Sequence, residues 1–423
     1  MRRFQFGRRQ TLGVIFGLVG LFLVGYVAPN LDQVDKGLTF EPPPDPVKLV
    51  VDPPITVTTI GVVFVLIAVA AFLEHRSTRI ASGALVLGTI LFIPLVLVLA
   101  LALSVSRDTN VMQLLVESLR LGTPVALGAM AGLWCERAGV VNIGIEGMML
   151  ASAGTGFMTY AVVGDARTTS ALWLAIFVAI ATGGLIGLLH AALSVSFRVD
   201  QIISGVVINL LALGLTGFLR SEVIVDTGIS TGVSTGPIAL PLLSDIPILG
   251  EQLFTNKPIF FVMFAVVGLT AFVLFRTPFG LRVRSVGENP HAAETLGIDP
   301  IKVRYRAVVI GGLIAGLGGA WFSLESQAGF QDNMTNGTGF IALAALIFGK
   351  WRPATAFAGA ILFGFTRALG ARLQILDVTI GDFSIPSEFL QSLPYVVTII
   401  VVAGAIGRAI APAADGVPYE RSR

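Results

Sequence analysis

Runs of about twenty apolar residues recur along most of the chain, and they restrict its fold more than any other feature. A helix of about 20 residues rises ~30 Å, which is the thickness of the hydrocarbon core of a bilayer. Of the 423 residues, 54% are hydrophobic and 13% are charged, against about 25% charged residues in an average soluble protein. The sequence therefore predicts an all-α, polytopic transmembrane helical bundle of about 10–12 crossings, with some short or broken helices.

Twelve segments are expected to cross the membrane. They lie near residues 11–29, 56–73, 80–103, 117–135, 139–163, 171–196, 202–220, 258–276, 306–326, 338–350, 354–372 and 393–411. Segment 139–163 begins with polar residues and segment 338–350 is short, so a broken or re-entrant segment is the alternative for both. Such a segment is tolerated only where protein or a water-filled cavity covers its backbone.

The charges of the connecting segments predict an orientation. Four arginines precede the first apolar run, which is long enough to be a retained anchor and is followed by no A-x-A cleavage site. Segments 221–257 and 373–392 are acidic, whereas "EHRSTR", "GKWRP" and the stretch 276–306 are basic. Basic loops stay in the cytoplasm. Both termini and residues 277–305 are therefore expected in the cytoplasm, and 221–257 outside.

Small residues four positions apart predict close helix packing. In a membrane they let two backbones approach and gain van der Waals contact. The pairs are Gly128 with Gly132, Gly183 with Gly187, Gly312 with Gly316, and Ala315 with Gly319.

Polar residues inside the apolar runs are candidates for a transport path. Asn142 and Glu146 are four apart and share a helix face, and Asn209 lies in the middle of another run. A charged carboxylate in hydrocarbon costs several kcal/mol, so Glu146 should face a cavity, a partner or a helix end. Structural hydrogen bonding is the alternative for all three residues. Glu325 and Gln327 end a helix near the expected outer face, where we expect solvent contact.

The polar stretch "SVGENPHAAETLGIDP" at 285–300 predicts a short, capped helix between two membrane segments. Asn289 is a good N-cap, Pro290 suits the first helical position, and Gly297 suits the stop. A helix of about two turns is unstable alone. Its small face is therefore expected to dock in a groove of another protein. That face comprises Ala292, Ala293 and Leu296.

Motifs for nucleotide hydrolysis and for metal-dependent or acyl-transfer chemistry do not occur in the sequence. Gly349–Lys350 is followed by Trp351, which does not complete a P-loop. The single cysteine, Cys135, excludes an internal disulfide, and the three histidines are dispersed. We therefore expect no enzymatic activity, no cofactor and no metal. A docking helix on a transport bundle without a motor implies a separate ATPase.

Four ordered blocks resemble the inner-membrane permease subunits of bacterial ABC importers for branched-chain amino acids, simple sugars and nucleosides. The blocks are "GVVNIGIEGMML", "DQIISGVVINLLALGLTGFL", "RSVGENPHAAETLGI" with "VRYRAVVIGGLIAGLGGAWFSLE", and "GFIALAALIFGKWRP". The resemblance covers about residues 107–411 and is closest to the nucleoside branch. It implies a plasma-membrane protein that works with an ABC ATPase subunit, a second homologous permease subunit and an extracytoplasmic substrate-binding lipoprotein.

The resemblance also implies that the short helix contacts the ATPase. The residues that carry this coupling role over are Gly287, Glu288, Asn289, Pro290, Ala292, Ala293 and Gly297. Residues 1–106 depart from the family pattern, with additional transmembrane segments and a proline-rich outer loop, and residues 412–423 form a cytoplasmic tail.

Three alternatives remain at this point. The substrate could be a simple sugar or a branched-chain amino acid. A secondary transporter that uses Glu146 as a proton or sodium site, or a channel, would not need an ATPase. ATP dependence separates these two from the importer.

Overall fold

The computed structural model describes residues 8–31, 36–39, 48–72, 108–163, 168–225, 234–246, 250–375, 379–380, 383–384, 392 and 409–421. The chain forms two compact units, one from residues 1–116 and 366–407 and the other from residues 117–365 and 408–423. Helices α4 (Val111–Arg137) and α14 (Pro353–Ile375) contribute residues to both.

The first unit contains a helical hairpin and a small sheet. Helix α1 (Arg8–Phe22) continues through a π-helical turn, Leu23–Val27, and packs on α2 (Pro53–Phe72). The rings of Phe16 and Phe64, 5.2 Å apart, lie in that interface. Strand β1 (Lys36–Thr39) pairs antiparallel with β2 (Lys48–Val51) and parallel with β3 (Asp108–Asn110). A second hairpin joins β6 (Thr379–Ile380) to β7 (Phe383–Ser384).

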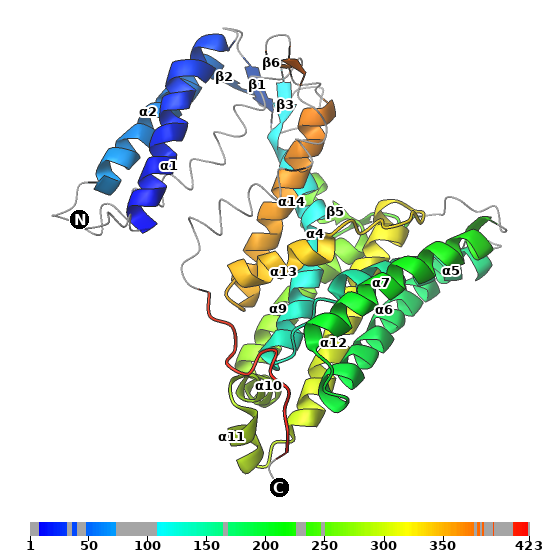
Figure 1. Ribbon diagram of the computed structural model, residues 1–423. Coiled ribbons are helices and arrows are strands. Elements are labelled where there is room, and N and C mark those ends of the chain that lie inside the picture. The colour runs from blue at the N-terminus through cyan, green and yellow to red at the C-terminus, as the bar shows by residue number, and fades with distance from the viewer. Residues whose placement is uncertain are drawn as a thin grey trace, which may run out of the picture. The chain divides into compact units, whose positions relative to one another are not determined.

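Long helices build the second unit (Figure 1). They are α5 (Ile145–Val163), α6 (Thr169–Ala191), α7 (Gln201–Leu219), α9 (Pro258–Arg276), α12 (Pro300–Ala320) and most of α4. Helices α5, α6 and α12 pack on one another, and α7 lies against α5. Three of these helices end in π-helical turns: η4 (Ala192–Ser196), η5 (Arg220–Val225) and η6 (Trp321–Ser326). Helices α10 (Pro278–Glu288) and α11 (Pro290–Thr295) lie at one end of the unit, which is called the α11 end below.

The predicted glycine contacts are confirmed. A Cβ on Gly183 would meet the carbonyl oxygen of Gly312 and lie 2.6 Å from the Cα of Gly316, so α6 and α12 touch backbone to backbone. Gly187 lies against the same segment of α12. The pair on α4 faces other helices, because Gly128 lies against Ala342 and Met149. Close approach of helices therefore organises this unit.

Neither segment 139–163 nor segment 338–350 forms one continuous helix that crosses a membrane. Residues 138–144 form a non-helical turn before α5 begins at Ile145. Helix α13 (Thr338–Phe348) has 11 residues, which at 1.5 Å each span about half of a ~30 Å hydrocarbon core. At the end opposite α11 lie the short helix α8 (Gly250–Phe254) and the β4 (Ile238–Ala239) and β5 (Thr255–Asn256) pair.

Within the described part of the chain, eight helices are long and apolar enough to cross a membrane. They match eight of the twelve expected segments, and α5 and α13 account for the two weak ones. Segment 80–103 lies outside the described residues, as does segment 393–411 except for its last three residues. The protein is a multi-pass, all-α membrane protein.

Candidate transport and coupling site

The turn at 138–144 is a buried break between two helices, and its backbone is held by side chains from α6 and α7. His190 Nε2 donates to the Val141 carbonyl (3.0 Å), and the Val141 N–H donates to Gln201 Oε1 (2.7 Å). Asn209 continues the pattern: its Nδ2 donates to the Ile143 carbonyl (3.1 Å) and its Oδ1 accepts from the Gly147 N–H (2.7 Å). The polar side chains therefore replace the hydrogen bonds that a continuous helix would supply.

Glu146 lies in the first turn of α5 and points at the start of α13. Its Oε1 accepts from Thr335 Oγ1 (2.6 Å) and from the Gly337 N–H (2.8 Å), and its Oε2 accepts from the Gly339 N–H (2.5 Å). The side chain is 7% exposed. The free N–H groups at a helix start favour an anion. The carboxylate therefore caps α13, as expected for a buried acid at a helix end.

Asn142 lies in the turn before α5, so the expectation that it shares a helix face with Glu146 is wrong, because the helix begins only at Ile145. Asn142 is fully buried and less completely paired than Glu146. Its Nδ2 lies 3.3 Å from the Cys135 sulfur and 3.6 Å from the Met148 sulfur, which are weak acceptors. Its Oδ1 has no hydrogen-bond partner among the described residues. A buried amide oxygen without a donor is uncommon. Among the three transport-path candidates, only Asn142 has a side-chain polar atom without a partner in the described part of the chain.

Glu325 corrects one expectation. Solvent contact was expected for this residue, but its side chain is 2% exposed, whereas the neighbouring Gln327 is exposed. Its two oxygens accept from the N–H groups of Ile259 (2.7 Å) and Phe260 (3.2 Å), at the start of α9. Glu325 therefore caps α9 as Glu146 caps α13. The expectation failed because the π-helical turn η6 directs the side chain inward.

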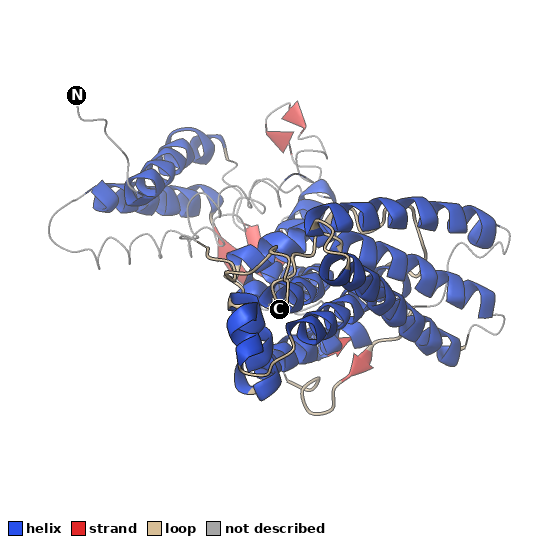
Figure 2. Cartoon of the chain, turned by 60° about the horizontal axis from the view of Figure 1, so that its bottom comes forward, coloured by secondary structure: helices blue, strands red, loops and turns tan. Residues whose placement is uncertain are grey.

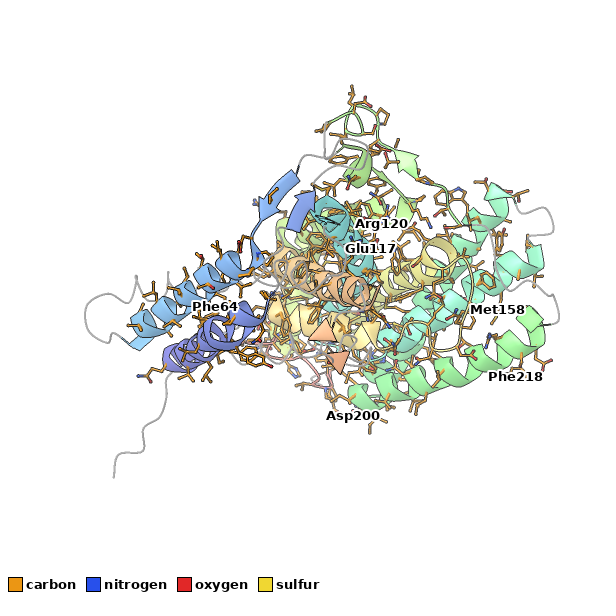
Figure 3. The ribbon with its side chains drawn as sticks, turned by 90° about the horizontal axis from the view of Figure 1, so that it is seen from above. Phe64, Glu117, Arg120, Met158, Asp200 and Phe218 are labelled. Atoms are coloured by element: carbon orange, nitrogen blue, oxygen red, sulfur yellow. The ribbon has the colours of Figure 1, made fainter. Side chains whose placement is uncertain are left out.

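A cavity of about 320 Å³ adjoins Glu325 at the end of the unit opposite α11. It is lined by polar and aromatic side chains of α4, α9 and η6, among them Arg120, Lys257 and Trp321. Figure 3, a view onto this end, shows Arg120 beside Glu117 on α4, and Arg120 Nε donates to Asn256 Oδ1 (2.7 Å). Burial lowers the pKa of the Lys257 ammonium, and the Glu325 carboxylate opposes that change.

Helix α11 has the predicted caps at both ends. Asn289 Oδ1 accepts from the Ala292 N–H (3.0 Å), and Pro290 occupies the first turn. At the other end Gly297 has φ +78°, and the N–H groups of Gly297 and Ile298 return to the carbonyls of Glu294 and Ala293 (2.9 and 3.1 Å). These two bonds form a Schellman motif. The next helix repeats the start, because Asp299 accepts from the Lys302 N–H (3.2 Å) ahead of Pro300.

The structure divides the predicted coupling residues into two groups. Gly287, Pro290 and Ala293 are buried against this chain, while Glu288, Asn289, Ala292 and Gly297 are exposed. Ala293 is 2% exposed and Leu296 is 81% exposed, so the face expected to dock in a partner is split. The inner side, with Ala293, holds α11 on the bundle, and the outer side, with Leu296, is exposed and could contact another protein.

Cationic side chains gather where α4 ends, and Arg137 there lies 4.0 Å from Glu288 at the end of α10. A cavity of about 580 Å³ is lined by Arg137, Lys350 and Arg352 together with apolar residues. Arg137 also donates to the Trp351 carbonyl through Nε (2.9 Å) and Nη2 (2.6 Å), which ties the end of α4 to the "GKWRP" turn. Lys350 and Trp351 have φ values of +51° and +53°, a backbone state that is rare for such residues.

Sequence reasoning missed the residues that hold this region from a distance. His190 and Gln201 support the turn at 138–144, and Arg304 was counted as a loop cation although its side chain is fully buried. For Gln201 a signal was present, because it directly follows the helix-capping Asp200 at the start of an apolar run. For His190 and Arg304 no local pattern indicates a distant carbonyl as partner.

The fold defines a class: a multi-pass helical membrane protein with interrupted helices and a capped surface helix. The family described as "Branched-chain amino acid transport system / permease component" matches residues 114–411. The chain belongs to this family of transport permeases. Proteins of this kind are transporter subunits and are not themselves enzymes.

Several relatives are similar over most of their length. The guanosine ABC transporter permease protein NupQ of Bacillus subtilis is 42% identical over 304 residues, which cover 71% of this chain and 94% of the relative. The nucleoside ABC transporter permease protein NupC of Lactococcus lactis is 39% identical over 319 residues, covering 74% and 99%. A putative glucose ABC transporter permease of Haloferax volcanii is 36% identical over 309 residues, covering 70% and 92%. No solved structure matches the chain.

Proposed function

We propose that this chain is the membrane-spanning subunit of an ATP-driven importer for nucleosides, in the plasma membrane of a bacterium. It pairs with a second homologous permease subunit and receives substrate from an extracytoplasmic binding lipoprotein. An ABC ATPase subunit binds at α11. The names of the two most similar relatives described above support a nucleoside substrate. A cavity lined by Trp321 and by charged side chains has the mixture of surfaces that a small polar solute requires.

The observation that carries this proposal is the preformed helix α11. It is capped at both ends, is fixed to the bundle through Ala293, and presents exposed residues on its other side. A rigid, partly buried helix can transmit a displacement to the bundle, whereas a mobile loop would absorb it. The basic residues of the stretch 276–306, which contains α11, support a cytoplasmic position.

The ion-coupled alternative receives less support from the geometry of Glu146. Both carboxylate oxygens accept hydrogen bonds from the chain itself, and two of the three donors are backbone N–H groups at the start of α13. An acid in this arrangement acts as a helix cap. The proposal therefore keeps Glu146 as a structural anchor and retains Asn142 as the transport-path candidate.

The first prediction concerns orientation. A cysteine introduced at Glu288, in a variant that lacks Cys135, is expected to resist a membrane-impermeant maleimide in intact cells and to react after permeabilisation. Glu288 is exposed, so access to the reagent depends on the side of the membrane. A cysteine at the exposed Leu242 is the matched control and should react in intact cells. External labelling at position 288 would overturn the orientation.

The second prediction concerns the C-cap of α11. A β-branched residue is strained at φ +78°, so Gly297→Val should distort the cap at a cost of about 1–2 kcal/mol. No neighbouring atom lies within 4 Å of a Cβ placed there, so the membrane core is undisturbed. The variant should insert normally and lose association with the ATPase or substrate-stimulated hydrolysis.

Gly297→Asn is the matched control, because asparagine tolerates the left-handed conformation. Co-purification with the ATPase and uptake into proteoliposomes measure both steps. The coupling proposal would be contradicted if Gly297→Val displaced α11 and the variant still showed wild-type co-purification and uptake.

A further inference from the structure

The C-terminal segment 409–421, called the tail below, lies along α10 and α11 (Figure 1, red) and contacts both. Figure 2 shows its C-terminal end in the foreground. The Ala414 N–H donates to the carbonyl of Gly287 (2.9 Å), which is the first residue of the coupling set. Arg421 Nε donates to Glu294 Oε1 (3.0 Å), and the rings of Tyr419 and His291 lie 5.1 Å apart. The tail therefore contacts α10 at its end and α11 along its length.

One buried side chain connects the tail to the interior. Arg304, near the start of α12, is 0% exposed. Its Nη1 donates to the Val417 carbonyl (3.0 Å) and its Nη2 lies 3.5 Å from the Ala414 carbonyl, while its Nε donates to the Ala138 carbonyl (3.1 Å). Burying a guanidinium is costly, and an apolar residue would fill the same volume. The planar fork of donors reaches carbonyls of two separate segments at once.

Ala138 begins the turn that precedes α5. The same turn carries Asn142, and His190, Gln201 and Asn209 hold its backbone. A continuous set of contacts therefore runs from α11 through the tail and Arg304 to the buried turn. Direct contacts between α10 and this region also exist, because Gly287 is closely packed against the Arg137 carbonyl. The tail is thus a second connection to the turn in addition to the packing of α10.

A partly buried acid and a surface ion pair accompany this connection. Asp415 lies within the tail, and burial raises its pKa to about 7 although the neighbouring Arg304 opposes the shift. Its Oδ1 accepts no hydrogen bond from the described residues. Arg198, in the segment between η4 and α7, pairs with Glu420 at 2.6 Å. The tail is therefore attached to several elements at the α11 end.

We propose that the tail and Arg304 position α11 relative to the turn at 138–144, so that movement of α11 reaches the membrane interior. Arg304 is a positioning residue and contacts neither substrate nor nucleotide in this role. The inference rests on the proposed function of α11 as the ATPase contact. It adds a segment and a side chain that lie outside the coupling set indicated by the sequence.

Two variants of the assembled transporter test it. Arg304→Lys keeps the positive charge but removes the planar guanidinium that reaches carbonyls of two segments. A deletion of residues 413–423 removes the tail beyond Pro412. Arg306→Lys, at an exposed position two residues further along α12, is the matched control. The readouts are co-purification with the ATPase and the stimulation of ATP hydrolysis by substrate-loaded binding protein. We expect near wild-type co-purification and a stimulation reduced by about three- to thirtyfold in both test variants.

The outcomes separate this inference from the proposed function. If wild-type protein does not bind an ATPase, the proposed function fails. If wild-type binds and Gly297→Val uncouples while both test variants keep full stimulation, only the positioning role fails. If the Arg304→Lys variant does not assemble, the substrate-stimulated ATP hydrolysis of the deletion variant alone tests the positioning role. Failure of both to insert in the membrane would overturn the proposal, because the tail would then be part of the folding core.

Discussion

Glu146→Ala is expected to destabilise the folded protein by about 3–5 kcal/mol, because it leaves three buried donors without an acceptor, at about 1–3 kcal/mol each. Three donors lose their partner in this variant: Thr335 Oγ1 and the N–H groups of Gly337 and Gly339. The start of α13 would then be uncapped inside the protein. Reduced yield of monodisperse protein and a lower unfolding midpoint in detergent measure the effect, and uptake should fall with the amount of folded transporter.

Glu146→Gln distinguishes an anchor from an ion site. The amide keeps one acceptor oxygen for Thr335 and Gly337 but presents an NH₂ group to the Gly339 N–H, so an intermediate loss of stability is expected. The variant should assemble and transport weakly with ATP. Complete loss of uptake with normal assembly and normal ATPase activity would favour the secondary transporter and contradict the importer.

Gly183→Ala should be nearly as disruptive, although it adds a single methyl group. The new Cβ would meet the backbone of α12 at Gly312 and Gly316, and backbone cannot move aside as a flexible side chain can. Overpacking of this kind costs about 1–3 kcal/mol and sometimes more. The unfolding midpoint in detergent should decrease, and the helices α6 and α12 should separate in distance measurements between spin labels.

Gly214→Ala provides the comparison for that variant. Gly214 lies on the exposed face of α7, and no atom lies within 4 Å of a Cβ placed there. The unfolding midpoint of this variant should stay close to wild type. If the two alanine variants were equally stable, the close contact between α6 and α12 would be contradicted.

The local elements were predictable because their causes lie within a few residues of sequence. Apolar length indicated the long helices, and glycines four residues apart indicated close helix packing, which the structure shows between α6 and α12. The Asn289–Pro290 start and the Gly297 stop of α11 depend on cap chemistry that the sequence displays directly. The weak beginning of segment 139–163 likewise corresponds to a real break before Ile145.

Partners across long sequence distances were not predictable. Glu146 was expected to face a cavity, a partner or a helix end, but nothing near it in sequence indicated α13, which begins about 190 residues later. Glu325 was assigned to solvent because it ends a helix near the expected outer face, although a π-helical turn directs it to the start of α9. Arg304 lies in a basic stretch and was grouped with it, although three carbonyl groups surround it inside the protein.

Uptake by the reconstituted transporter tests the central proposal most directly. The permease pair, the ATPase subunit and the substrate-binding protein would be placed in proteoliposomes with ATP on the side that α11 faces. Guanosine accumulation should require hydrolysable ATP, persist when proton and sodium gradients are collapsed, and decrease strongly with Gly297→Val but little with Gly297→Asn. Accumulation driven by an ion gradient without ATP or the ATPase would contradict the account.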